Sequence, residues 1–252
     1  MQKMNRDEIY QNLLKEAKSD HGVIGFILLA GRGRGFVTEH SDYDIAIIVL
    51  DEKKTECLEK YEKFNKTEVI DVGVYSFTDF KNHAAWDTGE AWDRYNFAHL
   101  TAEIDPTGEI QKIIDEKGMI PPGRIKEFVS KKLDGYMNLY YRMLKNARDG
   151  NSTAAYLDGA ESMFYLLDIL FGIEGRIRPY NKFLEWELKE YPLKLLPLPP
   201  EQFIEKLKKI MTTDNVDSQK EIFGKILKLF RQGGYGKVID GWKGYFILDD
   251  HL

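Results

Sequence analysis

The stretch Val23–Leu50, VIGFILLAGRGRGFVTEHSDYDIAIIVL, constrains this chain more than any other. It holds two apolar runs of strand length, Val23–Ala30 and Ile45–Leu50, and Asp42 and Asp44 stand just before the second run. Side chains alternate along a strand with a period of two, so the two carboxylates are expected on the same side. Carboxylates that point together repel each other, and a hard divalent cation with oxygen ligands relieves that repulsion.

A glycine-rich loop joins the two runs and carries Gly31, Gly33 and Gly35. Backbone N–H groups in such a loop can approach a phosphate closely, because glycine has no Cβ in the way. Metal-binding carboxylates beside a phosphate-binding loop predict a site for a nucleotide and Mg²⁺.

A third carboxylate, Asp71, lies in the strand-like run Thr67–Phe77 among β-branched residues. A carboxylate buried there without a partner would be costly. Either Asp71 faces solvent on the polar side of an edge strand, or it completes a metal site with Asp42 and Asp44 from the neighbouring strand. We favour the second interpretation because the Asp-x-Asp pair is present.

Other site types fit the loop and the acids less well. A dinucleotide-binding loop needs a further glycine where Phe36 stands, and a helix running on from it. The Walker Gly-Lys-Ser/Thr sequence is absent, and residues 42–53 lack the oxygen ligands and final Glu of an EF-hand. A glycosidase-type acid pair stays open, although it leaves the glycine loop without a role.

Composition narrows the class of protein. Of 252 residues, 43% are hydrophobic and 31% are charged, which is ordinary for a globular protein. The formal net charge of −5 argues against a general nucleic-acid binder, which normally presents a basic face. Cys57 is the only cysteine, which favours a reducing, cytoplasmic setting. The N-terminus shows no signal-peptide pattern, and no run is apolar enough to span a membrane.

The sequence predicts two domains, 1–120 and 121–252, with the boundary in the proline- and glycine-rich segment 118–123. Together they predict the α+β class, a mixed sheet flanked by helices followed by an all-α helical bundle. In the first domain, helical periodicity predicts helices over 5–19, 51–65 and a short segment ending at Lys117, and region 78–94 is expected to be helical or irregular. Strands are expected over 23–30, 45–50, 67–77 and 95–104. Helices of the second domain are expected over about 125–148, 152–172, 178–190, 200–212 and 217–231.

The chain resembles the polymerase-β-type nucleotidyltransferase superfamily over the segment LLAGRGRGFVTEHSDYDIAIIV. In the superfamily signature a Gly-Ser ends the first strand, an Arg-Gly follows, and Ser-Asp-x-Asp opens the second strand. Arg34-Gly35 keeps the six-residue step to Ser41, which the two aspartates follow. The departure is Ala30-Gly31, which stands where Gly-Ser is usual and lacks a hydroxyl that normally touches a phosphate.

The resemblance covers residues 20–117, and it implies transfer of a nucleoside monophosphate from a triphosphate to an acceptor hydroxyl. It assigns Asp42, Asp44 and Asp71 as ligands of two Mg²⁺ ions, which clamp the attacking and leaving oxygens in such a displacement. The helical remainder is similar in layout to aminoglycoside nucleotidyltransferases of the kanamycin type, in which a helical domain holds the acceptor.

The resemblance also implies the contacts of the nucleotide phosphates. Gly31, Gly35 and Ser41 would hold the β- and γ-phosphates, and Arg32 or Arg34 would neutralise the departing pyrophosphate. Either arginine has a structural alternative, which for Arg34 is a salt bridge at the surface.

A general base for the acceptor hydroxyl is sought in the helix expected over 152–172. Asp158, Glu161 and Asp168 share one face of that helix at spacings of three and seven. Glu161 is the first choice, by analogy with a helical-domain carboxylate in the drug-modifying relatives. Asp168 stands in an apolar run, and a salt bridge to Arg176 or Arg178 is the preferred explanation for it.

The expected function is transfer of AMP from ATP, or of another NMP, to a small polar acceptor such as an aminoglycoside-like antibiotic. Two other functions stay open: a toxin–antitoxin-type enzyme that adenylylates a protein side chain, and a catalytically silent nucleotide-binding regulator, which the Ala30-Gly31 departure permits. The expected partners are the nucleoside triphosphate and the acceptor, without nucleic acid or membrane, and a homodimer is left open.

Overall fold

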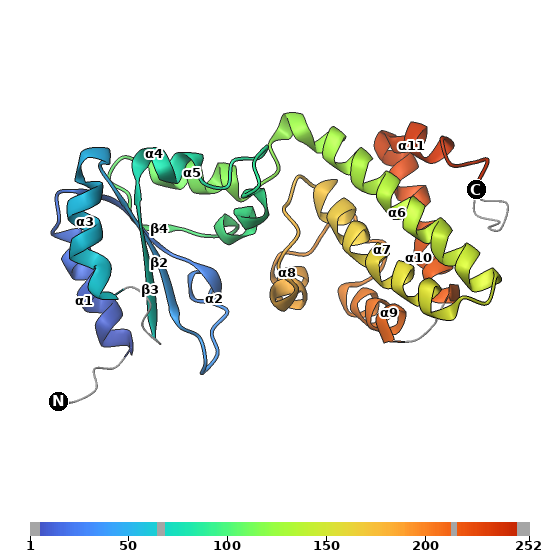
Figure 1. Ribbon diagram of the computed structural model, residues 1–252, viewed down its shortest axis with the longest axis horizontal. Helices are drawn as coiled ribbons and strands as arrows, with labels where there is room; N and C mark the ends of the chain where they lie inside the picture. The colour runs from blue at the N-terminus through green and yellow to red at the C-terminus, as the bar shows by residue number, and fades with distance from the viewer. Residues whose placement is uncertain (1–5, 65–68, 213–215, 246–252) are drawn as a thin grey trace. The chain divides into compact units, whose positions relative to one another are not determined.

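The computed structural model describes residues 6–64, 69–212 and 216–245. The fold is α+β, as the sequence predicts, with a mixed sheet followed by a larger helical part (Figure 1). The chain divides into two compact units, Met1–Met119 and Ile120–Leu252, and each has hydrophobic cores of its own. Within the described ranges, no helix is both long and apolar enough to cross a membrane.

The first unit is built on a four-stranded sheet with the order β3-β2-β1-β4. The central strands β1 and β2 are antiparallel, β3 pairs parallel to β2 at one edge, and β4 pairs antiparallel to β1 at the other. The strands span β1 (Val23–Leu28), β2 (Tyr43–Val49), β3 (Ile70–Ser76) and β4 (Ala102–Ile104).

Helices cover both faces of this sheet (Figure 1). On one face, α1 and α3 bury side chains such as Leu13 and Tyr61 against Phe26 of β1. On the other, α4, α5 and the 3₁₀ segment η3 pack around Ile48 and Ile114. The helical elements of the first unit are α1 (Arg6–Lys18), α2 (Ala30–Gly33), η1 (Asp51–Lys53), α3 (Lys54–Tyr61), η2 (Glu62–Phe64), α4 (Phe77–Asn82), η3 (Ala91–Phe97) and α5 (Glu109–Lys117).

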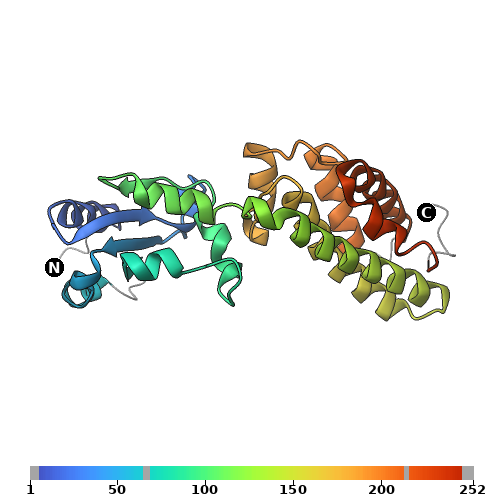
Figure 2. The ribbon, with the colours of Figure 1, turned by 90° about the horizontal axis from the view of Figure 1, so that it is seen from above.

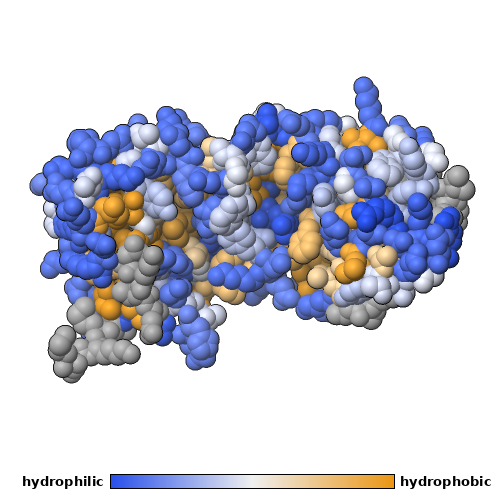
Figure 3. Space-filling view, in the orientation of Figure 1, coloured by the Kyte–Doolittle hydropathy of each residue, from blue (hydrophilic) through white to orange (hydrophobic). Residues whose placement is uncertain are grey.

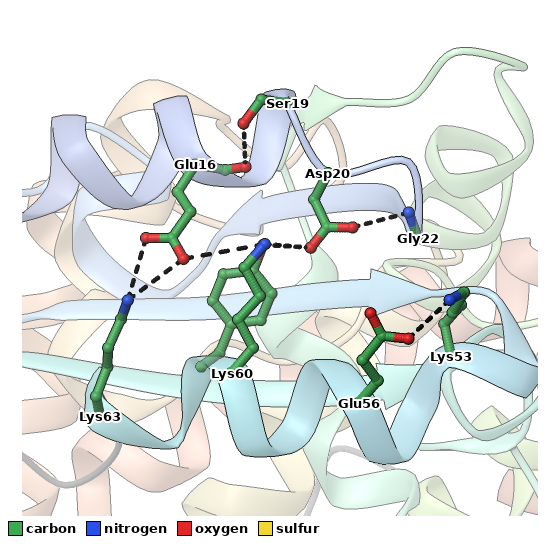
Figure 4. A network of polar contacts seen from close by, with 9 residues as sticks. Glu16, Ser19, Asp20, Gly22, Lys53, Glu56, Lys60 and Lys63 are labelled. Carbon is green, nitrogen blue, oxygen red and sulfur yellow. Dashed lines mark hydrogen bonds and ion pairs between the residues drawn. The ribbon is translucent and has the colours of Figure 1, made fainter.

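Ion pairs join α3 and η2 to the end of α1 and to the turn that follows it (Figure 4). Lys60 Nζ lies 2.6 Å from Asp20 Oδ2, and Lys63 Nζ lies 3.3 Å from Glu16 Oε2. The other carboxylate oxygen of Asp20 accepts the N–H of Gly22 at 2.9 Å, which fixes the turn into β1. Exposed ion pairs contribute only about 0–1 kcal/mol each, so the apolar layer beneath them holds α1 and α3 to the sheet.

The prediction of a continuous strand over 95–104 is wrong. The helical turn η3 extends through Phe97, His99 has a positive φ of 61°, and only Ala102–Ile104 forms a strand. The reason lies in Arg94, which is buried and donates hydrogen bonds to backbone carbonyls near the ends of α4 and α5. Those long-range bonds require a turned backbone, and the apolar run alone does not reveal them.

The second unit is helical, and α6 and α7 lie side by side along their lengths (Figures 1 and 2). Both have the bounds that the sequence predicts, with Gly150 at φ +77° in the turn between them. The elements are η4 (Pro122–Arg124), α6 (Ile125–Arg148), α7 (Ser152–Gly172), η5 (Asn181–Phe183), α8 (Leu184–Glu190), α9 (Pro200–Thr212), α10 (Val216–Phe230), the π-helical turn η6 (Arg231–Tyr235) and α11 (Gly236–Asp240).

Apolar residues at helical spacing form the core of this unit, with Leu133 and Met137 of α6 against Leu166 of α7 and Phe223 of α10. Charged residues occupy the opposite faces of these helices, as expected for amphipathic helices. Most of the surface visible in Figure 3 is accordingly hydrophilic.

Candidate functional site

Two of the three predicted carboxylates lie side by side on the sheet. In the parallel pair of β2 and β3, Asp44 is in register with Asp71. Asp44 is half-buried, whereas Asp71 is exposed because β3 is an edge strand. Asp42 is exposed and directly precedes β2, two residues before Asp44. Backbone pairing thus brings Asp44 and Asp71 together across 26 intervening positions of the sequence.

These acids stand at the uncovered end of one sheet face. Moving along the two strands on that face, the next pair in register is Ala46 with Gly73, and the pair after that is Ile48 with Tyr75. Ala46 and Ile48 are buried beneath α4, α5 and η3. The acids therefore lie beyond the part of this sheet face that the helices bury.

In the part of the chain that the structure describes, no three Asp, Glu, His or Cys side chains are gathered so as to hold a metal ion. The backbone nevertheless suits shared coordination by two carboxylates, because adjacent strands place side chains in register about 5 Å apart. Oxygen donors of this kind match a hard cation such as Mg²⁺. Asp44 and Asp71 fit such an ion, and Asp42 would have to turn toward them.

The glycine loop forms a short helix, α2, that begins next to Asp44. The N–H of Leu29, the residue before α2, donates to the carbonyl oxygen of Asp44 at 2.8 Å. The N–H groups of residues 33–36 donate to carbonyls within the turn itself. The donors at the start of α2 include the N–H groups of Gly31 and Arg32, which have no acceptor within the helix. The N–H groups of residues 33–36 are therefore already used within the turn, and the predicted phosphate contacts fall on the donors at the start of α2.

Gly31 has a structural requirement that explains the departure from Gly-Ser. A Cβ at this position would lie 2.5 Å from the carbonyl oxygen of Phe36, closer than real Cβ contacts allow. Ala30 before it has a positive φ of 49°, a conformation in which glycine is favoured. In this backbone a serine at position 31 would collide with the chain, so the missing hydroxyl is part of how the loop closes.

Arg34 is a buried brace, and the alternative of a surface salt bridge is wrong for it. Its guanidinium donates to the carbonyl oxygen of Ala30 at 2.7 Å and to the carbonyl oxygen of Tyr95, and it lies 4.7 Å from the centre of the Tyr95 ring. Only 8% of the residue is exposed. Arg34 therefore ties α2 to η3.

Arg32 and Ser41 shape the entry to β2. The Arg32 guanidinium lies 4.0 Å from the centre of the Tyr43 ring and donates to the carbonyl oxygens of Ser41 and Asp42 at 3.0 and 2.9 Å. The Ser41 hydroxyl accepts the N–H of Thr38 at 2.9 Å. Both residues stabilise the turn before Asp42, and Arg32 is the less buried of the two predicted arginines. Gly35, at φ +74°, is exposed beside them.

The acids of α7 have different surroundings. Glu161 is exposed. Asp158 is buried and accepts from Arg142 at 2.9 Å and from Asn146 at 2.8 Å.

Asp168 ion-pairs with Lys132 at 2.6 Å and with Arg178 at 2.8 Å. The salt bridge expected for Asp168 is therefore confirmed, with Arg178 as the predicted partner and Lys132 as a second. Arg176 pairs instead with the buried Glu187.

Sequence reasoning did not single out Gly73 and Tyr75, which continue the row of side chains that starts at Asp71. A Cβ on Gly73 would lie 2.8 Å from Cε2 of Tyr75, so the tyrosine ring lies across the glycine. A glycine inside a strand often marks such a close approach, so Gly73 within the strand-like run 67–77 is the sequence signal that could have predicted this contact.

No protein-family model matches the sequence, and no curated protein matches it significantly. Among solved structures, the chain is similar to a nucleotidyltransferase-like protein from Exiguobacterium sibiricum 255-15, with 12% sequence identity and a TM-score of 0.38. The match covers 88% of this chain and 79% of that one. We therefore base the functional assignment on the residues of this chain.

Proposed function

We propose that this protein is a metal-dependent nucleotidyltransferase that moves a nucleoside monophosphate, in the first instance AMP from ATP, to a hydroxyl of a small acceptor. The observation that carries the proposal is the register of Asp44 with Asp71 beside the start of α2. This arrangement supports the proposal because two carboxylates could share a cation there, and backbone donors at the start of α2 could contact a phosphate. The sequence pattern Ser41-Asp-x-Asp supports the same class of enzyme.

Asp44 and Asp71 would hold the cation, and Asp42 would join them from the segment before β2. When bound, Mg²⁺ stabilises negative charge on the attacking and leaving oxygens of the phosphoryl group. The protein's own part is to hold the triphosphate at the start of α2, where the N–H groups of Gly31 and Arg32 lie. Arg32 is the arginine that we assign to the pyrophosphate, because it is only half-buried at the entry to β2, whereas Arg34 is buried.

We assign binding of the acceptor to the helical unit, with the exposed Glu161 as the carboxylate that contacts it. An aminoglycoside-like antibiotic is the first acceptor to try, because amines on such a molecule suit the net charge of −5. The assignment of the acceptor rests on the layout of the chain. A failure to modify aminoglycosides would therefore contradict the acceptor but not the transfer reaction.

The test uses ATP labelled in the α-phosphate, Mg²⁺ and a panel of aminoglycosides, with pyrophosphate release and labelled acceptor as readouts. We expect Asp44→Asn and Asp71→Asn to lower the rate at least about a hundredfold, since each removes charge at the reacting phosphate. Asp115→Asn, which alters an exposed residue of α5, is the matched control and should keep full activity. Full activity in Asp44→Asn or Asp71→Asn would refute the assignment of the carboxylates.

A catalytically silent nucleotide-binding regulator is the second candidate. It is favoured by the loop, where the N–H groups of residues 33–36 and the guanidinium of Arg34 are used within the protein. The same assay separates the two functions. ATP binding measured by calorimetry, without pyrophosphate release for any acceptor, would support the regulator.

A further inference from the structure

A pocket of about 820 Å³ lies within the second unit, between α6 and α11. The two helices are in contact there (Figures 1 and 2). One wall is a face of α6 that runs from Glu127 to Tyr141, and the other consists of residues between Lys237 and Tyr245. Pockets of this size commonly hold small molecules. Neither wall carries a residue that we assign to the transfer reaction.

Three aromatic side chains line this pocket together: Tyr141, Trp242 and Tyr245. Their ring centres are 5.4 to 6.2 Å apart, and each pair of ring planes is inclined by 56° to 70°. Tyr141 and Trp242 are half-buried, whereas Tyr245 is 57% exposed. Adjacent rings of this kind present a large apolar surface that a ligand can cover.

Trp242 is held in place by α6. Its indole N–H donates to Asp134 Oδ1 at 2.8 Å, which joins the turn after α11 to α6. The same bond orients the Asp134 carboxylate, which also lines the pocket. Trp242 packs in addition against the hydrophobic core of the second unit, together with Val238. The aromatic wall is therefore formed before any ligand binds, which reduces the entropy cost of binding.

The polar side chains of the pocket are balanced in charge. Glu127 and Asp134 are acids, Lys131 and Lys237 are bases, and Asn138 is neutral. Carboxylates accept hydrogen bonds, ammonium groups donate them, and an amide does both. A hydroxyl group also donates and accepts, so a ligand that carries several hydroxyl groups can bond to all of these side chains.

Two other ligand classes fit the pocket less well. An organic cation is attracted to aromatic rings, but Lys131 and Lys237 offset the charge of the two acids, and Lys145 Nζ already lies 5.3 Å from the centre of the Tyr141 ring. A flat aromatic ligand is held best between parallel rings, whereas these rings are inclined by 56° or more. A sugar ring instead offers C–H groups on its faces and hydroxyl groups around its edge.

We propose that the pocket between α6 and α11 is a binding site for a saccharide. The rings of Trp242 and Tyr245 pack against the C–H groups of the sugar, and the polar side chains of α6, Asn138 among them, bond to its hydroxyl groups. The inference goes beyond the proposed function and does not depend on it, because every residue that carries it belongs to the second unit.

The experiment titrates the full chain with methyl α-D-glucopyranoside, methyl β-D-galactopyranoside and N-acetyl-D-glucosamine, and it follows binding by saturation-transfer NMR. We expect at least one of these sugars to bind, and Tyr245→Ala to lower its affinity at least about fivefold, because one ring is lost. Asn138→Ala, at an exposed position of α6, should lower the affinity in the same direction through lost hydrogen bonds. The matched control is Tyr191→Ala, which removes another exposed tyrosine ring, 5.5 Å from the ring of Trp186 and outside the pocket.

Binding of none of the three sugars would overturn the inference. Wild-type affinity in both Tyr245→Ala and Asn138→Ala, or an equal loss in the Tyr191→Ala control, would overturn it as well. Binding of tetramethylammonium in place of the sugars would show a cation site and refute the saccharide. A loss of affinity in either pocket variant, with its melting temperature and the control unchanged, supports the inference whether or not the protein transfers nucleotides.

Discussion

Ala30 and Gly31 show how single residues set the loop beside the carboxylates. Ala30 adopts a left-handed φ of 49°, which costs an alanine about 1–2 kcal/mol. The hydrogen bond from Arg34 to the Ala30 carbonyl, at 2.7 Å, helps to hold that conformation. Gly31 accepts the N–H of Phe36 at 2.8 Å, which brings the Phe36 carbonyl against the glycine. The loop therefore requires a glycine at position 31, whereas the backbone at position 30 would suit glycine better than the alanine that is present.

Gly31→Ser is expected to lower the free energy of unfolding by about 1–3 kcal/mol, because the new Cβ overlaps the Phe36 carbonyl. Ala30→Gly should raise it by about 1 kcal/mol or less, since relief of the positive φ is partly offset by added freedom in the unfolded chain. Urea unfolding followed by circular dichroism measures both. Gly89→Ser, at a glycine with open space around it, is the control. Equal stability of Gly31→Ser and Gly89→Ser would contradict the steric explanation.

At the scale of elements, two buried cations connect helix ends in the first unit. Lys117, in the last turn of α5, donates from Nζ to the carbonyl oxygens of Phe80 and His83 at the end of α4. Arg94 of η3 donates to carbonyls that include those of Ala84 and Met119. Cations are favoured where helix carbonyls end, so these two residues fasten α4, α5 and η3 to one another.

Burial, and to a smaller extent the charge of Arg94, lower the pKa of Lys117 from its usual value of 10.5 to about 8. Between pH 8 and 10.5 the unfolded chain therefore binds more protons at this residue than the folded chain does. Stability contributed by Lys117 must accordingly rise with pH across that window, and it is lowest below pH 8, where the buried amine is charged.

We expect the wild type to gain up to about 3 kcal/mol relative to Lys117→Met between pH 8 and 10.5. Urea unfolding of both proteins at several pH values measures the difference, which cancels the ionisation of tyrosines and Cys57. The carbonyl contacts of Nζ favour the charged form and reduce the gain. Curves that stay parallel across this range would show that the pKa of Lys117 is not lowered.

At the scale of the whole molecule, the cores of the two units share no residue. Two apolar clusters lie on either side of the sheet in the first unit, and the third lies among the helices of the second. Each unit falls within the size range of roughly 50–200 residues in which domains carry their own core.

A chain of residues 1–119 is therefore expected to fold alone, with a cooperative urea transition and the circular dichroism of a mixed α+β unit. Residues 120–252 should do the same as a helical unit. We expect this result because the cores of the two units share no residue. The sum of the two circular dichroism spectra should then match the spectrum of the full chain. A non-cooperative transition in either piece would show that its core is insufficient by itself.

Local patterns in the sequence determined most of the elements. The bounds of α6 and α7 follow from helical periodicity ended by Gly150 and Gly172–Gly175, and β1–β3 follow from short apolar runs. The pairing of Asp44 with Asp71 was also within reach, since alternation in two neighbouring strands predicts it. The helices and strands depend on residues close in the chain, where period and turn chemistry act directly.

Only the tertiary structure decided what the remaining polar residues do. Arg34 became a buried brace because the carbonyl of Tyr95, distant in sequence, lies against α2. The segment after Tyr95 became a turn because Arg94 reaches the ends of two helices. The Tyr75 ring lies over Gly73, and its centre is 5.8 Å from the centre of the His83 ring. Such contacts join residues far apart in the chain, and no local period encodes them. The order and spacing of the carboxylates and glycines in residues 23–50, in contrast, can be read from the sequence itself.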